Sequence, residues 1–333
     1  MPLAPSASSR VVEGAAMAGD SRCAPKATLK CGKSGKKQEK ANRRLKREEQ
    51  RAAAAAIEQT VRTAKGLANF FALATPNRRF RGGKVPASSQ QPRATAAERQ
   101  EFAIYDSPAT ALLAANAPLS DEIFNLTREN MKNLYNQVNF MEQGWDDDFK
   151  RRELTHEDAR LLVVLTEPNE TSAPVSRETD DSAALKDVSP DRLAGFLHYR
   201  FEVEEGTAVV YVYELQIKGA YQNMTLGRRL MLLLELAARA FNKAHSPLKF
   251  DKLMCTVIKE NAGAVRFYKI LCGFSTDESD PSNFVNEKLQ EQLLHALQTS
   301  GKGNSAAAKM LERAQEEEEE DEECEYEILK KNL

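Results

Sequence analysis

The sequence predicts an α+β domain, and three observations support that fold class. Residues 208–217 form an apolar run rich in Val and Tyr, which is typical of a strand buried on both faces. Leu and Ala recur at steps of three and four residues over 226–241, as on the apolar face of a helix. A further extended run, 193–203, is joined to the first by the turn 204–207, where Gly206 can adopt a positive φ.

The N-terminal part of the chain has a different composition. Residues 1–27 are small, polar and aperiodic, and we expect them to be disordered. Residues 26–51 carry eleven basic side chains, and 38–57 is rich in residues that favour helices. Because it has few large apolar side chains, this stretch cannot build a core of its own. Proline and glycine residues between 76 and 96 indicate a linker.

We therefore predict a basic, largely disordered or helical extension with its linker at 1–95 and a folded domain at 96–333. Within the domain, 167–192 and 280–322 interrupt the pattern of strands and helices and are expected to be surface insertions. The second insertion ends in eight consecutive acidic residues, 316–323.

Both charged segments leave more than one interpretation open. The basic arm is either a solvated helix or a patch for nuclear import or nucleic-acid contact by charge alone, because it lacks interleaved aromatic residues for base stacking. The acidic run is either a self-repelling solvated segment, a mimic of DNA towards basic histone tails, or a partner for the basic arm.

The remaining elements follow from caps and periodicity. Ser120 is expected to cap a helix over 123–138, and 155–158 resembles a capping box. A last strand at 325–329 should pair back into the main sheet. Further predicted elements are strands at 161–166 and 252–258, a short helix at 262–271, and helices at 286–299 and 305–315 within the second insertion.

The strand at 208–217, the loop 218–225 and the helix after it form an anion-binding arrangement. The first amides of a helix have no partner within the helix, and its dipole is positive at that end. A phosphate-bearing ligand fits there, although the loop matches neither a P-loop nor a GxGxxG dinucleotide loop. Glu214 lies in the strand just before the loop, either as a salt-bridged carboxylate or as a general base.

Two motifs in this region resemble those of the GNAT family of N-acetyltransferases. The loop 222–227, QNMTLG, is similar to the family's Q/R-x-x-G-x-G/A pyrophosphate loop, with Thr225 at the position of the middle glycine. The segment 261–274 is similar to the family's N-x-x-A-x-x-F/Y-Y-x-x-x-G-F signature. The resemblance implies a mixed central sheet flanked by helices (α/β/α), acetyl-CoA as co-substrate, and no metal.

The resemblance also implies a set of cofactor-binding residues. Backbone groups of the strand would bind pantetheine, amides of the loop would bind the pyrophosphate, Asn261 would bind the pantetheine arm, and Tyr268 would protonate the departing thiolate. These residues are Leu215, Gln216, Ile217, Gln222, Asn223, Met224, Thr225, Leu226, Gly227, Arg228, Asn261 and Tyr268.

A finer resemblance is to the histone-specific N-terminal acetyltransferases of this family, in the segments 126–135, 144–155, 198–206, 211–217, 256–264 and 324–329. It implies Glu214 and Tyr213 as catalytic residues and histone tails that begin Ser-Gly-Arg-Gly as partners. An α-amine has a pKa of about 8, against about 10.4 for lysine, so a carboxylate base suffices. The implied substrate-binding residues are Tyr135, Trp145, Glu202, Tyr213, Thr256 and Tyr326.

Strand geometry constrains this assignment. In a regular strand, alternation places Tyr211 and Tyr213 on the face opposite Glu214. A bulge is needed to bring Tyr213 and Glu214 towards one site, and we expect one here. Trp145 has two open interpretations, as a core residue or as an aromatic wall beside the substrate.

Composition sets the remaining expectations. The five cysteines show no metal-binding or CxxC spacing, and Cys255 and Cys272 are expected in the core. With no long apolar span, we expect no membrane binding. The finer resemblance implies a monomer of the nucleus and cytoplasm that binds no specific nucleic-acid sequence. Two alternatives stay open: a lysine or other N-acetyltransferase, and a non-catalytic histone-binding protein.

Overall fold

The computed structural model describes residues 34–66, 79–82, 100–167, 182–283 and 324–333. The chain divides into two compact units, 1–50 and 51–333, and helix α1 (Ser34–Gly66) begins in the first and ends in the second. In the first unit, residues 43–50 of α1 are exposed. The predictions for 1–27, 286–299, 305–315 and 316–323 lie outside the described residues.

The second unit is built on an eight-stranded sheet with the order β1-β2-β3-β4-β5-β6-β8-β7. Neighbouring strands are antiparallel, except that β5 and β6 run parallel, so the sheet is mixed as predicted. The strands are β1 (Arg79–Gly82), β2 (Gln100–Pro108), β3 (Arg160–Glu167), β4 (Leu193–Glu204), β5 (Thr207–Ile217), β6 (Lys252–Ile258), β7 (Ser275–Thr276) and β8 (Tyr326–Asn332).

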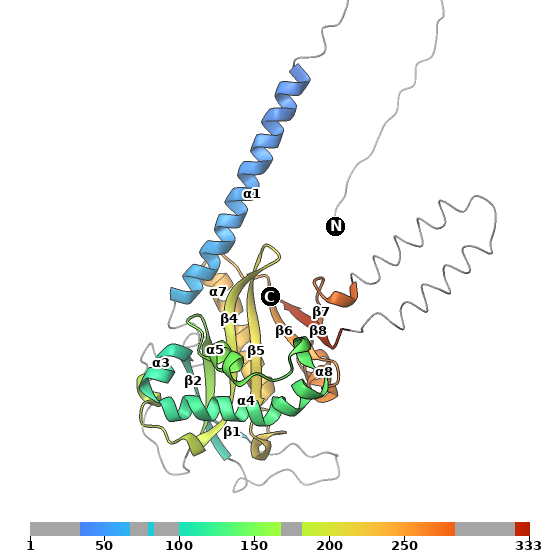
Figure 1. Ribbon diagram of the computed structural model, residues 1–333. Coiled ribbons are helices and arrows are strands. Elements are labelled where there is room, and N and C mark those ends of the chain that lie inside the picture. The colour runs from blue at the N-terminus through green and yellow to red at the C-terminus, as the bar shows by residue number, and fades with distance from the viewer. Residues whose placement is uncertain (1–33, 67–78, 83–99, 168–181, 284–323) are drawn as a thin grey trace, which may run out of the picture. The chain divides into compact units, whose positions relative to one another are not determined.

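Helices cover both faces of this sheet, with α4 on one face and α7 on the other (Figure 1). The α-helices of the second unit are the end of α1, α3 (Ala109–Ala115), α4 (Ala117–Gln137), α5 (Asp147–Leu154), α6 (Ser182–Leu185), α7 (Leu226–Ala244) and α8 (Ala262–Arg266). Single turns of 3₁₀-helix are η2 (Phe140–Glu142), η3 (Pro190–Arg192) and η4 (Gly219–Tyr221), and η5 (Phe267–Leu271) is a π-helix.

The alternation of side chains along the strands creates two apolar cores. In β3, Leu162 and Val164 pack in the core under α7, whereas Leu161 and Val163 pack in the core under α4. The first core also takes Val61 from α1. Because both faces are covered, β3 and β4 read as continuous apolar runs and not as alternating ones.

Most predicted elements of the second unit are confirmed. The hairpin between β4 and β5 turns at Glu205 and Gly206, which both have positive φ, of 45° and 73°. Strand β8 pairs with β6 in antiparallel register, from Lys252 opposite Asn332 to Ile258 opposite Tyr326, so the last strand returns to the main sheet as expected.

Two capping predictions are wrong. Ser120 lies inside α4, which begins three residues earlier, because Asn116 accepts a hydrogen bond from the Leu119 amide and Pro118 favours the first turn. Thr155 does not start a helix, since it ends α5, and its hydroxyl donates to the carbonyl of Arg151. The N-cap of α5 is Asp146, which accepts from the Phe149 amide.

Three regions are more ordered than the sequence pattern indicated. Strand β1 lies within the predicted linker. It pairs with β2, a strand that the sequence pattern did not indicate. The insertion at 167–192 contains α6, and its Leu185 is fully buried in the core under α4. Side chains from these segments are individually unremarkable in sequence, because only the tertiary fold places them against a strand or a core.

Two further findings concern composition. Cys255 and Cys272 are buried, as predicted for core residues. None of the helices that the structure describes is both long enough and apolar enough to span a membrane.

Candidate active site

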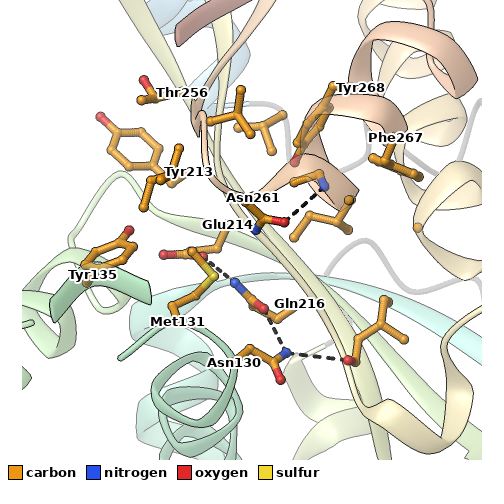
Figure 2. A pocket seen from close by; sticks show the side chains of 18 of the residues that line it. Asn130, Met131, Tyr135, Tyr213, Glu214, Gln216, Thr256, Asn261, Phe267 and Tyr268 are labelled. Carbon is orange, nitrogen blue, oxygen red and sulfur yellow. Dashed lines mark hydrogen bonds between the residues drawn. The ribbon is translucent and has the colours of Figure 1, made fainter. Parts of the chain in front are cut away.

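The site lies where two parallel strands separate. The pairing of β5 with β6 begins at Val209 opposite Lys252 and ends at Val212 opposite Cys255, although both strands continue. A cavity of about 1910 Å³ opens beyond this point. In Figure 2, Asn130 and Tyr135 of α4 lie on one side of Glu214, and Asn261 and Tyr268 lie on the other. The cavity thus has two halves. We call the half beside α4 and α5 the acceptor half, and the half beside α7 and α8, where the predicted cofactor residues lie, the donor half.

A β-bulge in β5 places the central residues. His198 pairs with Glu214 and Tyr199 pairs with Val212, so Tyr213 is the extra residue on β5. The bulge breaks the alternation of side chains, and both Tyr213 and Glu214 line the cavity. The bulge expected from the sequence is therefore confirmed.

Backbone geometry shapes the donor half. Asn223 and Thr225 have left-handed φ values of 61° and 66°, and Thr225 is the N-cap of α7. Its side chain makes no capping hydrogen bond, so the first amides of α7 remain to bind an anion. A Cβ on Gly227 would lie 3.3 Å from the ring of Phe267, which explains a small residue here.

All twelve predicted cofactor residues line the cavity. Asn261 also caps α8, since its side-chain oxygen accepts from the Ala264 amide (3.1 Å). Tyr268 projects from the π-helix η5 and is buried, and burial raises the pKa of its hydroxyl well above the ordinary value. The phenol therefore carries its proton at neutral pH.

Charged side chains shape the acceptor half. Glu214 is 4% exposed, and its Oε1 accepts a hydrogen bond from Lys150 Nζ at 2.8 Å. Its Oε2 accepts from Gln216 Nε2 at 2.7 Å. Lys150 also donates to Glu153 (2.9 Å) and to the hydroxyl of Tyr135 (3.4 Å). Burial, followed by the charge of Glu214, raises the pKa of Tyr135 above its ordinary range.

Sequence reasoning missed Lys150 and Glu153, although both line the cavity. The available signal was helical spacing: Lys150 stands four residues before the buried Leu154 on α5, and so shares its inward face. A lysine in the apolar stripe of a short, otherwise polar helix indicates a buried partner of opposite charge.

The predicted substrate residues do not all reach the cavity. Tyr135, Trp145, Tyr213 and Thr256 line it, and Thr256 is hydrogen-bonded to Tyr211 at 2.6 Å. Glu202 is not a lining residue.

Glu202 and Tyr326 lie behind the cavity wall, and each contacts a residue that lines it. Glu202 accepts a hydrogen bond from the Tyr213 hydroxyl at 2.7 Å. Tyr326 packs against the lining residue Phe140, with ring centroids 6.0 Å apart. Phe140 in turn lies 4.7 Å from Tyr135, so it links α4 to β8.

Trp145 combines its two interpretations. Its ring packs 6.4 Å from Phe124, a core residue, and 5.5 Å from Tyr135, a lining residue. Its indole nitrogen donates to Asp147. Trp145 is thus a half-buried wall of the cavity that is anchored on the core under α4.

One cavity thus brings together the start of α7, the split between two parallel strands and the buried carboxylate of Glu214. The model of the GNAT acetyltransferase family matches residues 135–274 of this chain. Its fold is the GNAT fold, and acetyl-CoA is its co-substrate.

Three solved structures illustrate the range of similar folds. A GNAT acetyltransferase from Listeria monocytogenes shares 12% identity, with 72% of this chain and 99% of that chain covered and a TM-score of 0.35. The NatC complex bound to Gag peptide and CoA shares 15%, with 53% and 86% covered and a TM-score of 0.30. An aminoglycoside acetyltransferase from an uncultured soil sample shares 14%, with 50% and 85% covered and a TM-score of 0.30. These likenesses do not identify an acceptor.

Proposed function

We propose that this chain acetylates the α-amine of protein N-termini, with histone tails that begin Ser-Gly-Arg-Gly as the preferred acceptor. The main supporting observation is the buried Glu214 at the junction of the donor and acceptor halves. Glu204 and Glu205 also line the cavity, and Glu202 lies behind Tyr213. These carboxylates give the acceptor half the charge that a basic tail requires.

The proposal also uses the sequence resemblance to one type of enzyme. The segments 126–135, 144–155, 211–217 and 324–329 resemble N-alpha-acetyltransferase 40, also called NatD. Three of them contribute Tyr135, Trp145, Tyr213 and Glu214 to the cavity wall. The fourth contributes Tyr326, which contacts that wall through Phe140.

In the proposed reaction, acetyl-CoA supplies the acetyl group as a thioester. Glu214 accepts a proton from the substrate ammonium, directly or through a water, so that the amine nitrogen can attack the carbonyl carbon. The nitrogen then loses its second proton, and the bond from that carbon to sulfur breaks. The departing sulfur takes a proton from the Tyr268 hydroxyl, and the proton released by the nitrogen restores that hydroxyl through water.

A pair of peptides tests the acceptor. The purified protein is incubated with acetyl-CoA and a peptide that begins Ser-Gly-Arg-Gly, or with the same peptide carrying a blocked α-amine, and products are mapped by mass spectrometry. We expect acetylation of the free α-amine and none of the blocked peptide. Acetylation of a lysine in the blocked peptide would instead support the alternative of a lysine acetyltransferase.

The conformation of Thr225 bears on the non-catalytic alternative, since this residue replaces a family glycine. Thr225 adopts the left-handed φ of 66° that a glycine would take, and the loop still lines the cavity. A degenerate loop is therefore a weaker interpretation. Calorimetric titration with acetyl-CoA checks this, because a binding-only protein with a degenerate loop would show no heat of binding.

Location and assembly are also part of the proposal. We propose that the enzyme acts as a monomer in the nucleus and cytoplasm, where new histone tails are available. Fluorescence imaging of the tagged full chain and light scattering of the purified protein test these two statements separately.

A further inference from the structure

Lys150 is a buried cation beside the proposed base. Its side chain is 5% exposed, and its ammonium lies 2.8 Å from Glu214 and 2.9 Å from Glu153. Both carboxylates are also largely buried, with side-chain exposures of 4% and 15%. Two negative charges and one positive charge thus share a small volume away from bulk water.

The neighbouring charges explain why Lys150 stays ionised. Burial by itself would lower the pKa of Lys150, but the nearby Glu214, Tyr135 and Glu153 raise it above the ordinary value. Lys150 therefore keeps its proton and does not act as a shuttle. Burial, opposed by Lys150, raises the pKa of the Glu153 carboxyl.

Hydrogen bonds also fix the direction of the base. Lys150 holds Oε1 of Glu214 and Gln216 holds Oε2. Gln216 is fixed in turn by Asn130, whose side-chain nitrogen donates to its Oε1 at 2.9 Å (Figure 2). Lys150 is the charged member of this set, so it alone can change both the direction and the ionisation of Glu214.

We propose that Lys150 is a positioning residue that keeps Glu214 ionised and aimed into the cavity, and that Glu153 opposes this effect. The inference rests on the proposed role of Glu214 as the base. The proton taken from the substrate ammonium goes to Glu214, while Lys150 remains charged throughout. Removing Lys150 leaves two buried carboxylates that repel each other, so Glu214 binds a proton at a higher pH. Removing the charge of Glu153 has the opposite effect.

Other titratable groups face this cluster from each neighbouring element. Tyr135 of α4 and Tyr268 of η5 interact with Glu214, and burial raises the pKa of both, so they are neutral near pH 7. From β4, Arg200 donates to the Glu153 carbonyl at 2.6 Å, and burial lowers the pKa of His198, which stays neutral. Tyr135 and Tyr268 therefore keep the same charge throughout the range that the test covers.

The test is the dependence of kcat on pH from about 5.5 to 9 in four variants. The acidic limb is the fall of kcat on the acidic side of this profile. For Lys150→Met we expect its midpoint to rise by about one pH unit or more, with kcat at pH 7 reduced about tenfold. Glu153→Gln moves the limb down, whereas Lys150→Arg leaves it within a few tenths of a unit of wild type. Arg152→Met removes an exposed cation from the same helix and serves as the matched control, with no shift.

Opposite shifts in the two charge variants separate positioning from simple support of the fold. If Lys150→Met lowers only the melting temperature and leaves the limb in place, the proposal is wrong. If that variant does not fold, Glu153→Gln still tests the opposing effect. The double variant Lys150→Met with Glu153→Gln removes one charge of each sign and provides a second folded background, in which we expect a limb between those of the single variants.

The acceptor assignment can fail without affecting this test. The profiles are measured with whichever peptide the wild type acetylates, either the one with a free α-amine or the one with a blocked α-amine and a lysine. A wrong acceptor class then leaves the comparison among variants intact. Calorimetry with acetyl-CoA at pH 7 confirms that each variant retains the donor half, where we expect affinities within about twofold of wild type, since no substituted residue contacts the loop that begins α7.

Discussion

The two halves of the cavity recognise their ligands in different ways. The donor half relies on backbone: the amides at the start of α7, the separated edge of β5, and left-handed residues such as Thr225. The acceptor half relies on side chains, with Glu214 and Lys150 joined in a buried ion pair. Substitutions in the acceptor half should therefore change chemistry and pH dependence, whereas those in the donor half matter when they change backbone geometry.

The largest expected effect is at Glu214. Glu214→Gln keeps the shape of the side chain and can still form a hydrogen bond with Gln216, but it cannot accept the proton. We therefore expect kcat to fall about 10²- to 10⁴-fold. Acetyl-CoA affinity should stay within about twofold, because the donor half is unchanged. Steady-state kinetics and calorimetry on the same preparation measure both. Equal losses in kcat and in acetyl-CoA affinity would show that the two halves are not separable.

The next largest expected effect is on the free energy of unfolding, at the pairing of β4 with β5. A Cβ on Gly195 of β4 would lie 2.5 Å from the carbonyl oxygen of Gln216, and neither backbone can move without disturbing the pairing of β4 with β5. We expect Gly195→Ala to lower the free energy of unfolding by about 2–3 kcal/mol. Urea denaturation measures this. The control Gly206→Ala tests a glycine at the hairpin turn, where positive φ but no crowding opposes a side chain.

A pH effect on stability sharpens the description of the acceptor half. His198 is fully buried and stacks on Tyr213, with ring centroids 5.0 Å apart, and burial depresses its pKa well below 6.5. As the pH falls below about 6.5, His198 takes up a proton in the unfolded chain but stays neutral in the folded chain. Its contribution to the free energy of unfolding is therefore fully present above pH 6.5 and is lost as the pH falls. Below pH 6.5 the free energy of unfolding therefore changes by about 1.4 kcal/mol per pH unit through this group.

The variant His198→Gln should lack that slope. Urea denaturation between about pH 5 and 7.5 gives the slopes of wild type and variant, and their difference isolates the histidine from other titrating groups. Parallel curves would mean that His198 takes up a proton in the folded state.

The smallest effect is in the donor half. A β-branched residue with φ of 66° is strained, so Thr225→Gly should raise the free energy of unfolding by about 0.5–1 kcal/mol after the greater freedom of glycine in the unfolded chain is counted. Acetyl-CoA affinity should be equal or slightly tighter. Thr225→Ala keeps the strain and is the control. Destabilisation by glycine would show that the hydrogen bond from the Thr225 hydroxyl to the Met224 carbonyl outweighs the strain.

The sequence predicted the donor half well because local patterns encode it. A strand, a loop and an amphipathic helix in succession are sufficient to place orphan amides. The twelve cofactor residues came from the family resemblance, and all of them line the cavity. The bulge at Tyr213 was also predictable, since two neighbouring residues were required at one site. Caps were less predictable: Ser120 and Asn116 are both good capping residues, and packing of the first turn decided between them.

The chain's own sequence determined the order of strands and helices, the anion-binding loop and the identity of the buried carboxylate, since each depends on residues that are near one another along the chain. Only the tertiary structure decided that Lys150, 64 positions before Glu214, forms an ion pair with it, and that Leu185 and β1 belong to the packed domain. Contacts between distant segments depend on how the sheet and helices pack in three dimensions, and periodicity along the chain carries no information about that packing.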